Sequence, residues 1–216
     1  RGVVPLLVGG SGLYVSAVIY DFQFPGTDQA LRDSLEQRFE TEGLKPLAAE
    51  LLEADPDAAD AVDLNNPRRV IRALEVLQLT GEPPTSGLAA RGQWWHEPSV
   101  LVGLQAPRDW LHRRIETRVH QMFDSGLVDE VKALLEGGMS STASQAIGYR
   151  EVADMLAGEF SEADAIEQVI HHTRRYVRRQ DSWFRRDQNI HWLPADAEDV
   201  SAQVLAAVLP HAETAS

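Results

Sequence analysis

The chain has 216 residues, a formal net charge of −13 and 44% hydrophobic residues, the composition of an ordinary globular protein of one or two domains. It has no cysteine, which excludes disulfides and cysteine-ligated metal sites. No apolar run approaches the ~20 residues that cross a bilayer. With no recognisable signal peptide, we expect a cytoplasmic protein with no membrane partner. The negative charge argues against indiscriminate nucleic-acid binding but permits a local basic surface, because salt screens exposed charges over about 8–10 Å.

The first predicted elements are a strand and a helix. Residues 3–8 form an apolar run that predicts a buried parallel strand, and the glycine turn Gly9–Gly12 follows it. Because a parallel strand needs neighbours, we expect the chain to be a fragment that lacks preceding sequence. Residues 12–20 are apolar on nearly all sides and predict a buried helix.

Residues 26–90 predict only helices. Thr27 or Asp28 can cap the first of them, and Asn66 can cap a later one that begins with proline and runs to about Thr80. Two shorter helices are expected between these, at 44–54 and 56–61.

The rest of the chain alternates between strands and helices. Strands are expected at 99–104 and 190–193. Ser161 and Asp164 form a capping box at the start of a long helix. The expected helices are 109–124, 127–135, 149–156, 162–186 and 200–209. The order predicts an α/β core with a parallel sheet, formed by 1–25 and 91–216, and an all-helical insertion, 26–90.

An arginine-rich segment, 173–186 (TRRYVRRQDSWFRR), contains six arginines and three aromatic residues and carries a net charge of +5. Arginine with aromatic side chains suits phosphate contacts and base stacking. Arg174 and Arg178 share one helix face, so they could form an anion-facing row. The alternative is a core helix with solvated arginines, whose apolar stripe includes Tyr176 and Trp183.

A second arginine cluster lies in 66–75 (NPRRVIRALE). Arg68, Arg69 and Arg72 fall in the first two turns of a helix, where the helix dipole disfavours cations. A bound polyanion would offset this cost. The alternative is ion pairing with Asp63 or Glu75.

Arg113, Arg114 and Arg118 form a third cluster, for which pairing with Glu116 is the alternative to a functional role. The Gly-Gly-Ser-Gly turn could bring backbone N–H groups to a phosphate or base, but it is neither a Walker A loop nor a dinucleotide-binding motif. The histidines form no recognisable metal site.

Five segments in order resemble the tRNA dimethylallyltransferase family, the bacterial tRNA isopentenyltransferases, over nearly the whole chain. They are VGGSGLY (8–14), NPRRVIRALEV (66–76), MFDSGLVDEV (122–131), AIGYRE (146–151) and TRRYVRRQ with WFR (173–185).

The resemblance implies a P-loop NTPase-like core, a nucleotide-binding type of fold, with a helical insertion that grips the tRNA anticodon stem-loop. It implies transfer of a dimethylallyl group from dimethylallyl diphosphate to N6 of adenosine 37, with Mg²⁺, by an enzyme expected to be monomeric. It also implies that the target base is extruded from its stack, in agreement with the need to unstack a base before modifying it.

The resemblance also assigns site residues. A first set is expected to contact tRNA: Ser11, Arg32, Arg68, Arg69, Arg72, Gln145, Gly148 and Arg150. A second set is expected on the diphosphate side: Arg118, Arg174 and Arg178. The family's P-loop, its general base and the main Mg²⁺ ligands lie before the Gly-Gly-Ser turn, so we expect no catalytic residue or metal ligand here and an inactive chain.

Three other interpretations stay open. The chain could belong to an adenylate isopentenyltransferase acting on free nucleotides, although the helical insertion favours tRNA. It could be a non-catalytic RNA-binding remnant. It could also be a kinase-like domain whose arginines only form salt bridges.

Overall fold

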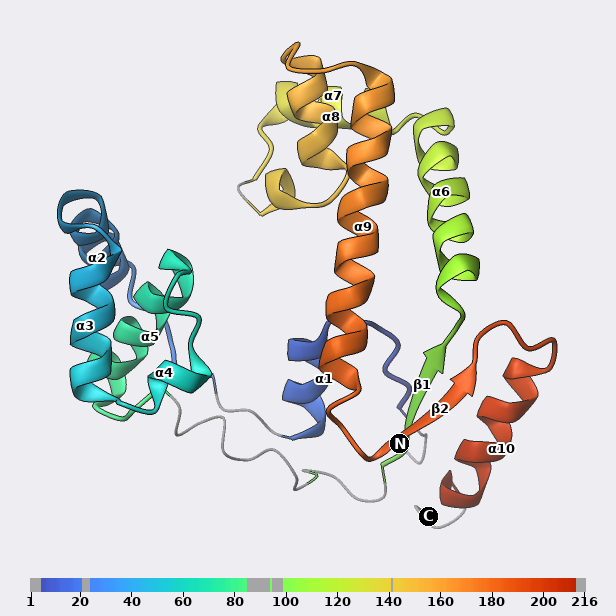
Figure 1. Cartoon of the computed structure of the whole chain (residues 1–216), viewed down its shortest axis with the longest axis horizontal. Coiled ribbons are helices and arrows are strands. Elements are labelled where there is room, and N and C mark those ends of the chain that lie inside the picture. The colour runs from blue at the N-terminus through green and yellow to red at the C-terminus, as the bar shows by residue number, and fades with distance from the viewer. Residues whose placement is uncertain (1–4, 21–23, 85–93, 95–98, 141, 213–216) are drawn as a thin grey trace. The chain divides into compact units, whose positions relative to one another are not determined.

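The computed structural model describes residues 5–20, 24–84, 94, 99–140 and 142–212 (Figure 1). The chain divides into two compact units. Residues 1–12 and 100–216 form one, called the α/β unit below; residues 13–99 form the other, the helical unit. The predicted insertion, 26–90, falls within the helical unit.

Helix caps define the elements of the helical unit. Asp28 accepts a hydrogen bond from the backbone N–H of Leu31 at 3.0 Å and so starts α2, and Asn66 caps α5. Gly81 ends α5 in the left-handed conformation, at φ 72°. The helices, with α1 beginning at the boundary between the units, are α1 (Gly12–Ile19), α2 (Gln29–Glu42), α3 (Leu44–Ala54), α4 (Ala58–Ala61) and α5 (Pro67–Thr80).

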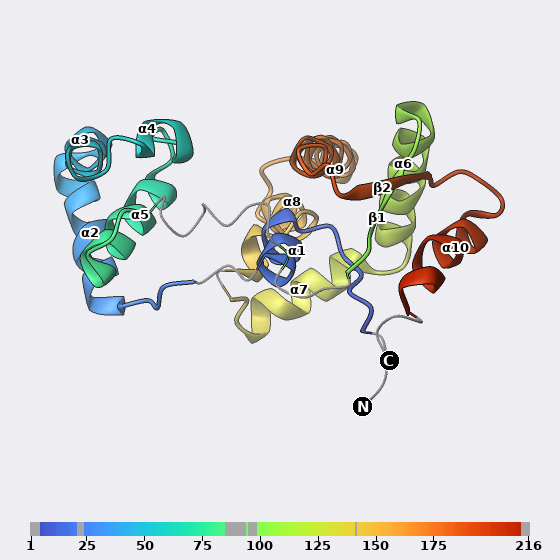
Figure 2. The same cartoon turned by 90° about the horizontal axis from the view of Figure 1, so that it is seen from below.

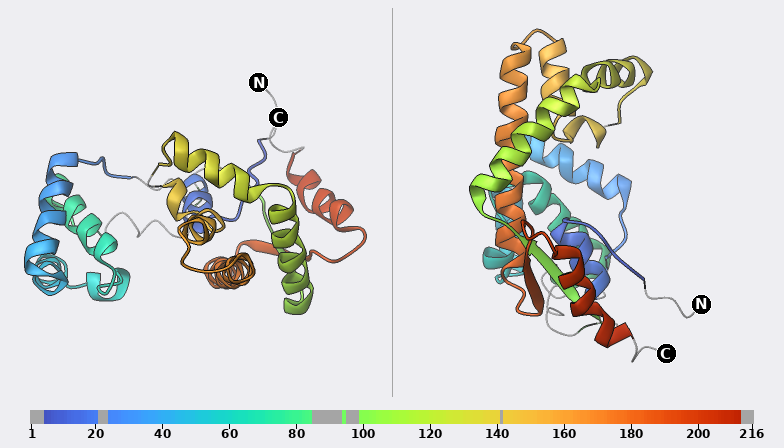
Figure 3. Two further views of the ribbon diagram at one scale, coloured as in Figure 1. Left: turned by 90° about the horizontal axis from the view of Figure 1, so that it is seen from above. Right: turned by 90° about the vertical axis from the view of Figure 1, so that its right-hand side faces the viewer.

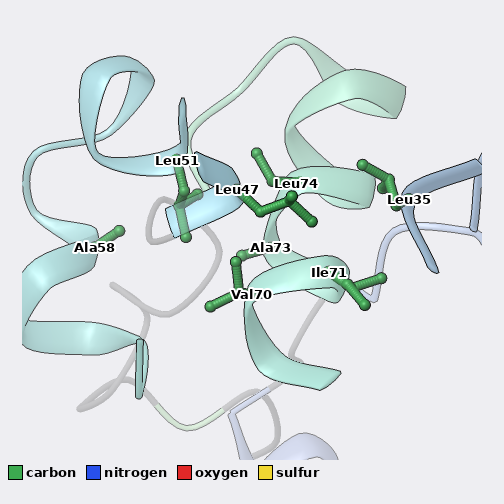
Figure 4. Close-up of a cluster of buried hydrophobic side chains, with 8 residues drawn as sticks. All are labelled: Leu35, Leu47, Leu51, Ala58, Val70, Ile71, Ala73 and Leu74. Carbon is green, nitrogen blue, oxygen red and sulfur yellow. The ribbon is translucent and has the colours of Figure 1, made fainter. Parts of the chain in front are cut away.

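The core of the helical unit lies where α2, α3 and α5 pack together (Figure 4). Leucines from all three helices are almost completely buried, and α5 contributes most of the remaining apolar side chains. The buried set is Leu35, Leu47, Leu51, Ala58, Val70, Ile71, Ala73 and Leu74. This unit therefore has a hydrophobic core of its own.

Two parallel strands lie in the α/β unit, β1 (Leu101–Gln105) and β2 (Ile190–Pro194); their arrows run the same way in Figure 1, and Figure 2 shows them from below. Gly103 pairs with Trp192. A Cβ at Gly103 would lie 2.7 Å from Ile190 Cγ2, which explains glycine in this strand. The helices are α6 (Arg108–Asp124), α7 (Leu127–Gly137), the short η2 (Ala143–Gln145), α8 (Tyr149–Leu156), α9 (Glu162–Phe184) and α10 (Val200–Ala212).

Helix α9 is the central helix of the α/β unit and packs against α6 and α8 (Figures 1 and 3). Val169 of α9 lies in one core cluster with Ile115 and Val119 of α6. Helices α7 and α8 share a second cluster, built on Leu127, Val131 and Val152. Helix α10 contacts β2.

The predicted α/β class with a parallel sheet is confirmed, but the predicted strand at 3–8 is wrong for its described part. Residues 5–8 form no strand, and Leu6 and Val8 are each 83% exposed; residues 3 and 4 lie outside the described residues. Apolar character alone does not make a strand, which needs a hydrogen-bonded neighbour, and β1 pairs with β2.

Two predictions of burial also fail. Helix α1 forms as expected, but it has no buried residue, and Tyr14 is 72% exposed. Tyr176, expected on the core face of α9, is 37% exposed and lies beneath the Arg179 guanidinium, 5.8 Å from ring centre to Cζ. Neither position is set by helical periodicity alone, because burial depends on which elements pack against the helix.

Candidate nucleic-acid interface

The Gly-Gly-Ser turn lies against α9. Gln180 donates a hydrogen bond from Nε2 to the carbonyl oxygen of Gly10 at 2.8 Å. A Cβ at Gly12 would collide with the indole ring of Trp183. These contacts place the predicted site residue Ser11, which is half-buried, beside the arginine-rich helix.

The predicted site residues Gly148 and Arg150 are held by a glutamate that sequence reasoning did not select, and Gln145 ends the short η2 just before them. Glu151 is 2% exposed and accepts a hydrogen bond from the backbone N–H of Gly148 at 2.7 Å. Its other oxygen accepts from His172 Nδ1 of α9 at 2.6 Å and from Arg150 at 3.3 Å. The Gly-x-x-Glu spacing, typical of a capping interaction, could have signalled the first of these bonds.

Glu151 stays ionised in this setting. Burial favours the neutral acid, but the hydrogen bonds from Gly148 and His172 and the charge of Arg150 outweigh it and lower the pKa of Glu151. An ionised carboxylate only accepts hydrogen bonds, so His172 must be the donor. The segment that begins α8 is thus fixed by a buried negative charge.

The diphosphate-side candidates lie on α6 and α9, which pack together. Arg174 pairs with Glu116 of α6, while its Nε is buried without a partner among the described residues. Arg118 and Arg178 are exposed and form no ion pair in the described part of the chain. Glu116 therefore neutralises an arginine of α9, whereas the sequence suggested a partner within its own helix.

In the helical unit, two of the predicted tRNA contacts share one buried acid. Arg32 of α2 and Arg72 of α5 lie 2.9 and 2.8 Å from Glu75 Oε2. Glu75 is completely buried and also accepts from the backbone N–H of Asp28 at 3.2 Å. Burial raises the pKa of Glu75, but the bonds from Arg72 and Asp28 outweigh it, so the pKa is lowered overall.

Arg68 and Arg69, in the first turn of α5, differ from Arg72. Both are exposed, and their side chains form no hydrogen bond or ion pair among the described residues. They lie beside a helix amino terminus, where N–H groups and the dipole favour an anion. They are therefore exposed cations of the helical unit that a phosphate could reach.

Among the described residues, no three histidine or acidic side chains are grouped so that they could hold a metal ion. These residues therefore do not fit a resident Mg²⁺. No described helix has the length and apolarity to cross a membrane.

Together these features define a mixed α/β protein with a parallel strand pair and a separate helical unit, in which both units present exposed arginines. The IPP transferase family model matches residues 1–187. The chain belongs to this family, and the resemblance expected from the sequence is confirmed.

The relatives carry one name. The chain is 47% identical over 214 residues to the tRNA dimethylallyltransferase of Thermobifida fusca, covering 98% of this chain and 66% of that protein. It is 49% identical to the enzyme of the same name from Salinispora arenicola, covering 96% of this chain and 61% of that protein. The chain thus spans less than two thirds of the length of these relatives.

A solved structure agrees with the fold. The full-length tRNA isopentenylpyrophosphate transferase of Bacillus halodurans matches 94% of this chain and 65% of its own length, with 36% identity and a TM-score of 0.58. This agreement confirms the predicted fold type.

Proposed function

We propose that this chain is the tRNA-gripping and diphosphate-facing part of a tRNA dimethylallyltransferase, a cytoplasmic and monomeric enzyme. The observation that carries the proposal is the 47% identity over 98% of the chain to a protein of that name. The exposed arginines of both units support it, since an acidic protein has no general need for unpaired cations in these places.

The proposed reaction joins C1 of the dimethylallyl group to N6 of adenosine 37. The bond between C1 and the diphosphate oxygen breaks, the diphosphate leaves with the electron pair, and one N6 proton is lost. Positive groups near the departing oxygen stabilise the charge that develops there. Arg118 and Arg178 are exposed and could supply such groups, and Arg174 adds a third guanidinium that Glu116 partly neutralises.

Mg²⁺ is the proposed cofactor, since a divalent cation would neutralise further diphosphate charge. Because the described residues form no metal cluster, we assign no step to the ion here. By the family resemblance, the general base lies before the Gly-Gly-Ser turn. We therefore propose that the 216-residue chain alone binds its substrates without turning over.

The tRNA side of the proposal is the anticodon stem-loop. Arg68 and Arg69 would contact phosphates, while the loop of Gln145, Gly148 and Arg150 and the turn at Ser11 would lie nearer the target base. A separate helical unit with exposed arginines favours this substrate over a free nucleotide, which requires no extended grip.

Binding of an anticodon stem-loop RNA at several salt concentrations tests the proposal. Each of Arg68→Ala and Arg69→Ala should reduce the slope of log affinity against log salt by about 0.7–0.9, the loss of one phosphate contact. Lys45→Ala is the matched control, since it removes one exposed charge from α3 of the same unit. Equal effects from all three variants would contradict a specific interface.

Three further measurements address the rival functions and the proposed inactivity. Displacement of the RNA from the chain by AMP would support an enzyme that acts on free nucleotides. Prenylation of tRNA by the 216-residue chain would disprove the proposed inactivity. RNA binding with no affinity for dimethylallyl diphosphate would favour a non-catalytic remnant.

A further inference from the structure

The buried carboxylate of Glu75 joins the start of α2 to α5. Glu75 is completely buried in α5, and its Oε1 accepts from the backbone N–H of Asp28, the cap of α2. Its Oε2 accepts from Arg32 and Arg72. One carboxylate thus joins α5, the first turn of α2 and the residue that starts α2.

Arg72 has further partners that extend this arrangement. Its Nη1 donates to the carbonyl oxygen of Gly26 at 3.1 Å, and its Nη2 donates to that of Pro25 at 2.7 Å. Three of the five guanidinium N–H groups are therefore directed to internal acceptors. A phosphate that used the same edge of the guanidinium would have to displace two backbone carbonyls and the carboxylate.

The position of Arg72 on α5 connects this cluster to the exposed arginines. Arg68 and Arg69 precede it by four and three residues, so each of them is a neighbour of Arg72 on the helix surface. Arg72 bonds to Glu75 and to residues 25–26, whereas the side chains of Arg68 and Arg69 have no partner among the residues that the structure describes. The three arginines of one segment thus have two different environments.

We propose that Arg72 is a positioning residue: with Glu75 it ties residues 25–28 to α5 and sets the direction in which Arg68 and Arg69 meet RNA. This proposal rests on the proposed function for its RNA ligand. It assigns phosphate contact to Arg68 and Arg69 and removes it from Arg72. Arg32 belongs to the same arrangement through its bond to Glu75.

The test compares Arg72→Ala and Glu75→Gln with Arg68→Ala, using an anticodon stem-loop RNA at a temperature where every variant is folded. Glu75→Gln keeps the side-chain volume but presents an amide N–H₂ to the two arginines. We expect Arg72→Ala and Glu75→Gln each to weaken binding about tenfold with an unchanged salt slope, because no phosphate contact is lost. The double variant should be no weaker than either single one, since both disrupt one unit. Arg68→Ala should reduce the salt slope. Arg72→Lys should bind RNA more tightly than Arg72→Ala but less tightly than the wild type, because a lysine ammonium cannot reproduce the planar set of guanidinium N–H donors.

Two results would overturn the proposal. Tighter binding by Glu75→Gln, together with a reduced slope for Arg72→Ala, would make Arg72 a phosphate contact that Glu75 restrains. Lower melting temperatures with unchanged affinity would make the cluster a source of stability alone.

Amide hydrogen exchange separates failure of this proposal from failure of the proposed function. If the wild-type chain binds no RNA, the proposed function fails and the RNA part of the proposal fails with it. The attachment of residues 25–28 to α5 is then judged by the exchange rates of the backbone amides of Asp28 and Leu31. Faster exchange in Arg72→Ala at these amides, with α3 unchanged, supports this attachment, and unchanged exchange refutes it.

Discussion

His172 of α9 donates its Nδ1 hydrogen to Glu151 of α8 at 2.6 Å, across 21 residues of sequence. The same carboxylate accepts from the backbone N–H of Gly148, whose φ of 99° favours glycine. One buried charge therefore fixes both the start of α8 and its attachment to the arginine-rich helix.

Glu151→Gln should destabilise the α/β unit. The amide can accept only through one oxygen, so either Gly148 or His172 loses its acceptor inside the protein. We expect the free energy of unfolding to fall by about 1–3 kcal/mol. This is less than the cost of breaking a fully buried ion pair, because His172 is partly exposed. Urea unfolding measures it, with Glu159→Gln as a control at an exposed position near the end of α8. Equal stability of the two variants would contradict a structural role for Glu151.

Acidification should destabilise both units through their buried acids. Glu75 and Glu151 have pKa values lowered from an ordinary value of 4.5, so each binds protons more weakly in the folded chain. Their contribution is fully present above pH 4.5 and is lost as the pH falls through the lowered folded pKa values. Urea unfolding at a series of pH values should therefore show that the free energy of unfolding declines below pH 4.5. The decline should be shallower in the double variant Glu75→Gln, Glu151→Gln. An equally steep decline in the double variant would assign the effect to other carboxylates.

What the sequence predicted correctly is mostly local. Asp28, Asn66 and Ser161 each bond within three residues, so their capping roles follow from short patterns. The paired strands β1 and β2 were recognisable as short apolar runs. The arginine clusters could also be located, because charge is a property of the sequence itself.

What the sequence missed depends on distant partners. Glu75 meets Arg32 across 43 residues, and Arg174 meets Glu116 across 58. No spacing rule connects such positions. The pairing of Arg72 with Glu75, three residues further on, was open as an alternative, but the bonds of Arg72 to Pro25 and Gly26 could not be predicted. The predicted burial of Leu6 and Tyr14 was wrong for the same reason, since burial depends on which elements pack against a residue rather than on its apolar character.

Gly12→Ala should disturb the Gly-Gly-Ser turn, whereas Gly9→Ala should not. An added methyl at Gly12 meets the indole of Trp183, while one at Gly9 meets no heavy atom within 4 Å. Overpacking of this kind costs about 1–3 kcal/mol. The tryptophan fluorescence of the chain, to which Trp183 contributes as one of five tryptophans, and the melting temperature of the two variants measure the difference. Unaltered spectra in Gly12→Ala would mean that the turn does not lie on α9.

Arg118→Ala and Arg178→Ala should weaken pyrophosphate binding without reducing stability. Both side chains are exposed and unpaired in the described part of the chain, so their removal leaves no buried acid without a partner. Each lost charge-assisted contact should reduce affinity by about 10-fold, from roughly 1.5 kcal/mol per bond. Calorimetric titration with inorganic pyrophosphate measures this. Arg113→Ala is the matched control, because it lies on α6 five residues from Arg118 and therefore about 140° around the helix. If Arg113→Ala weakened pyrophosphate binding as much as Arg118→Ala, the effect would come from overall charge, and the diphosphate-side assignment of α6 would be wrong.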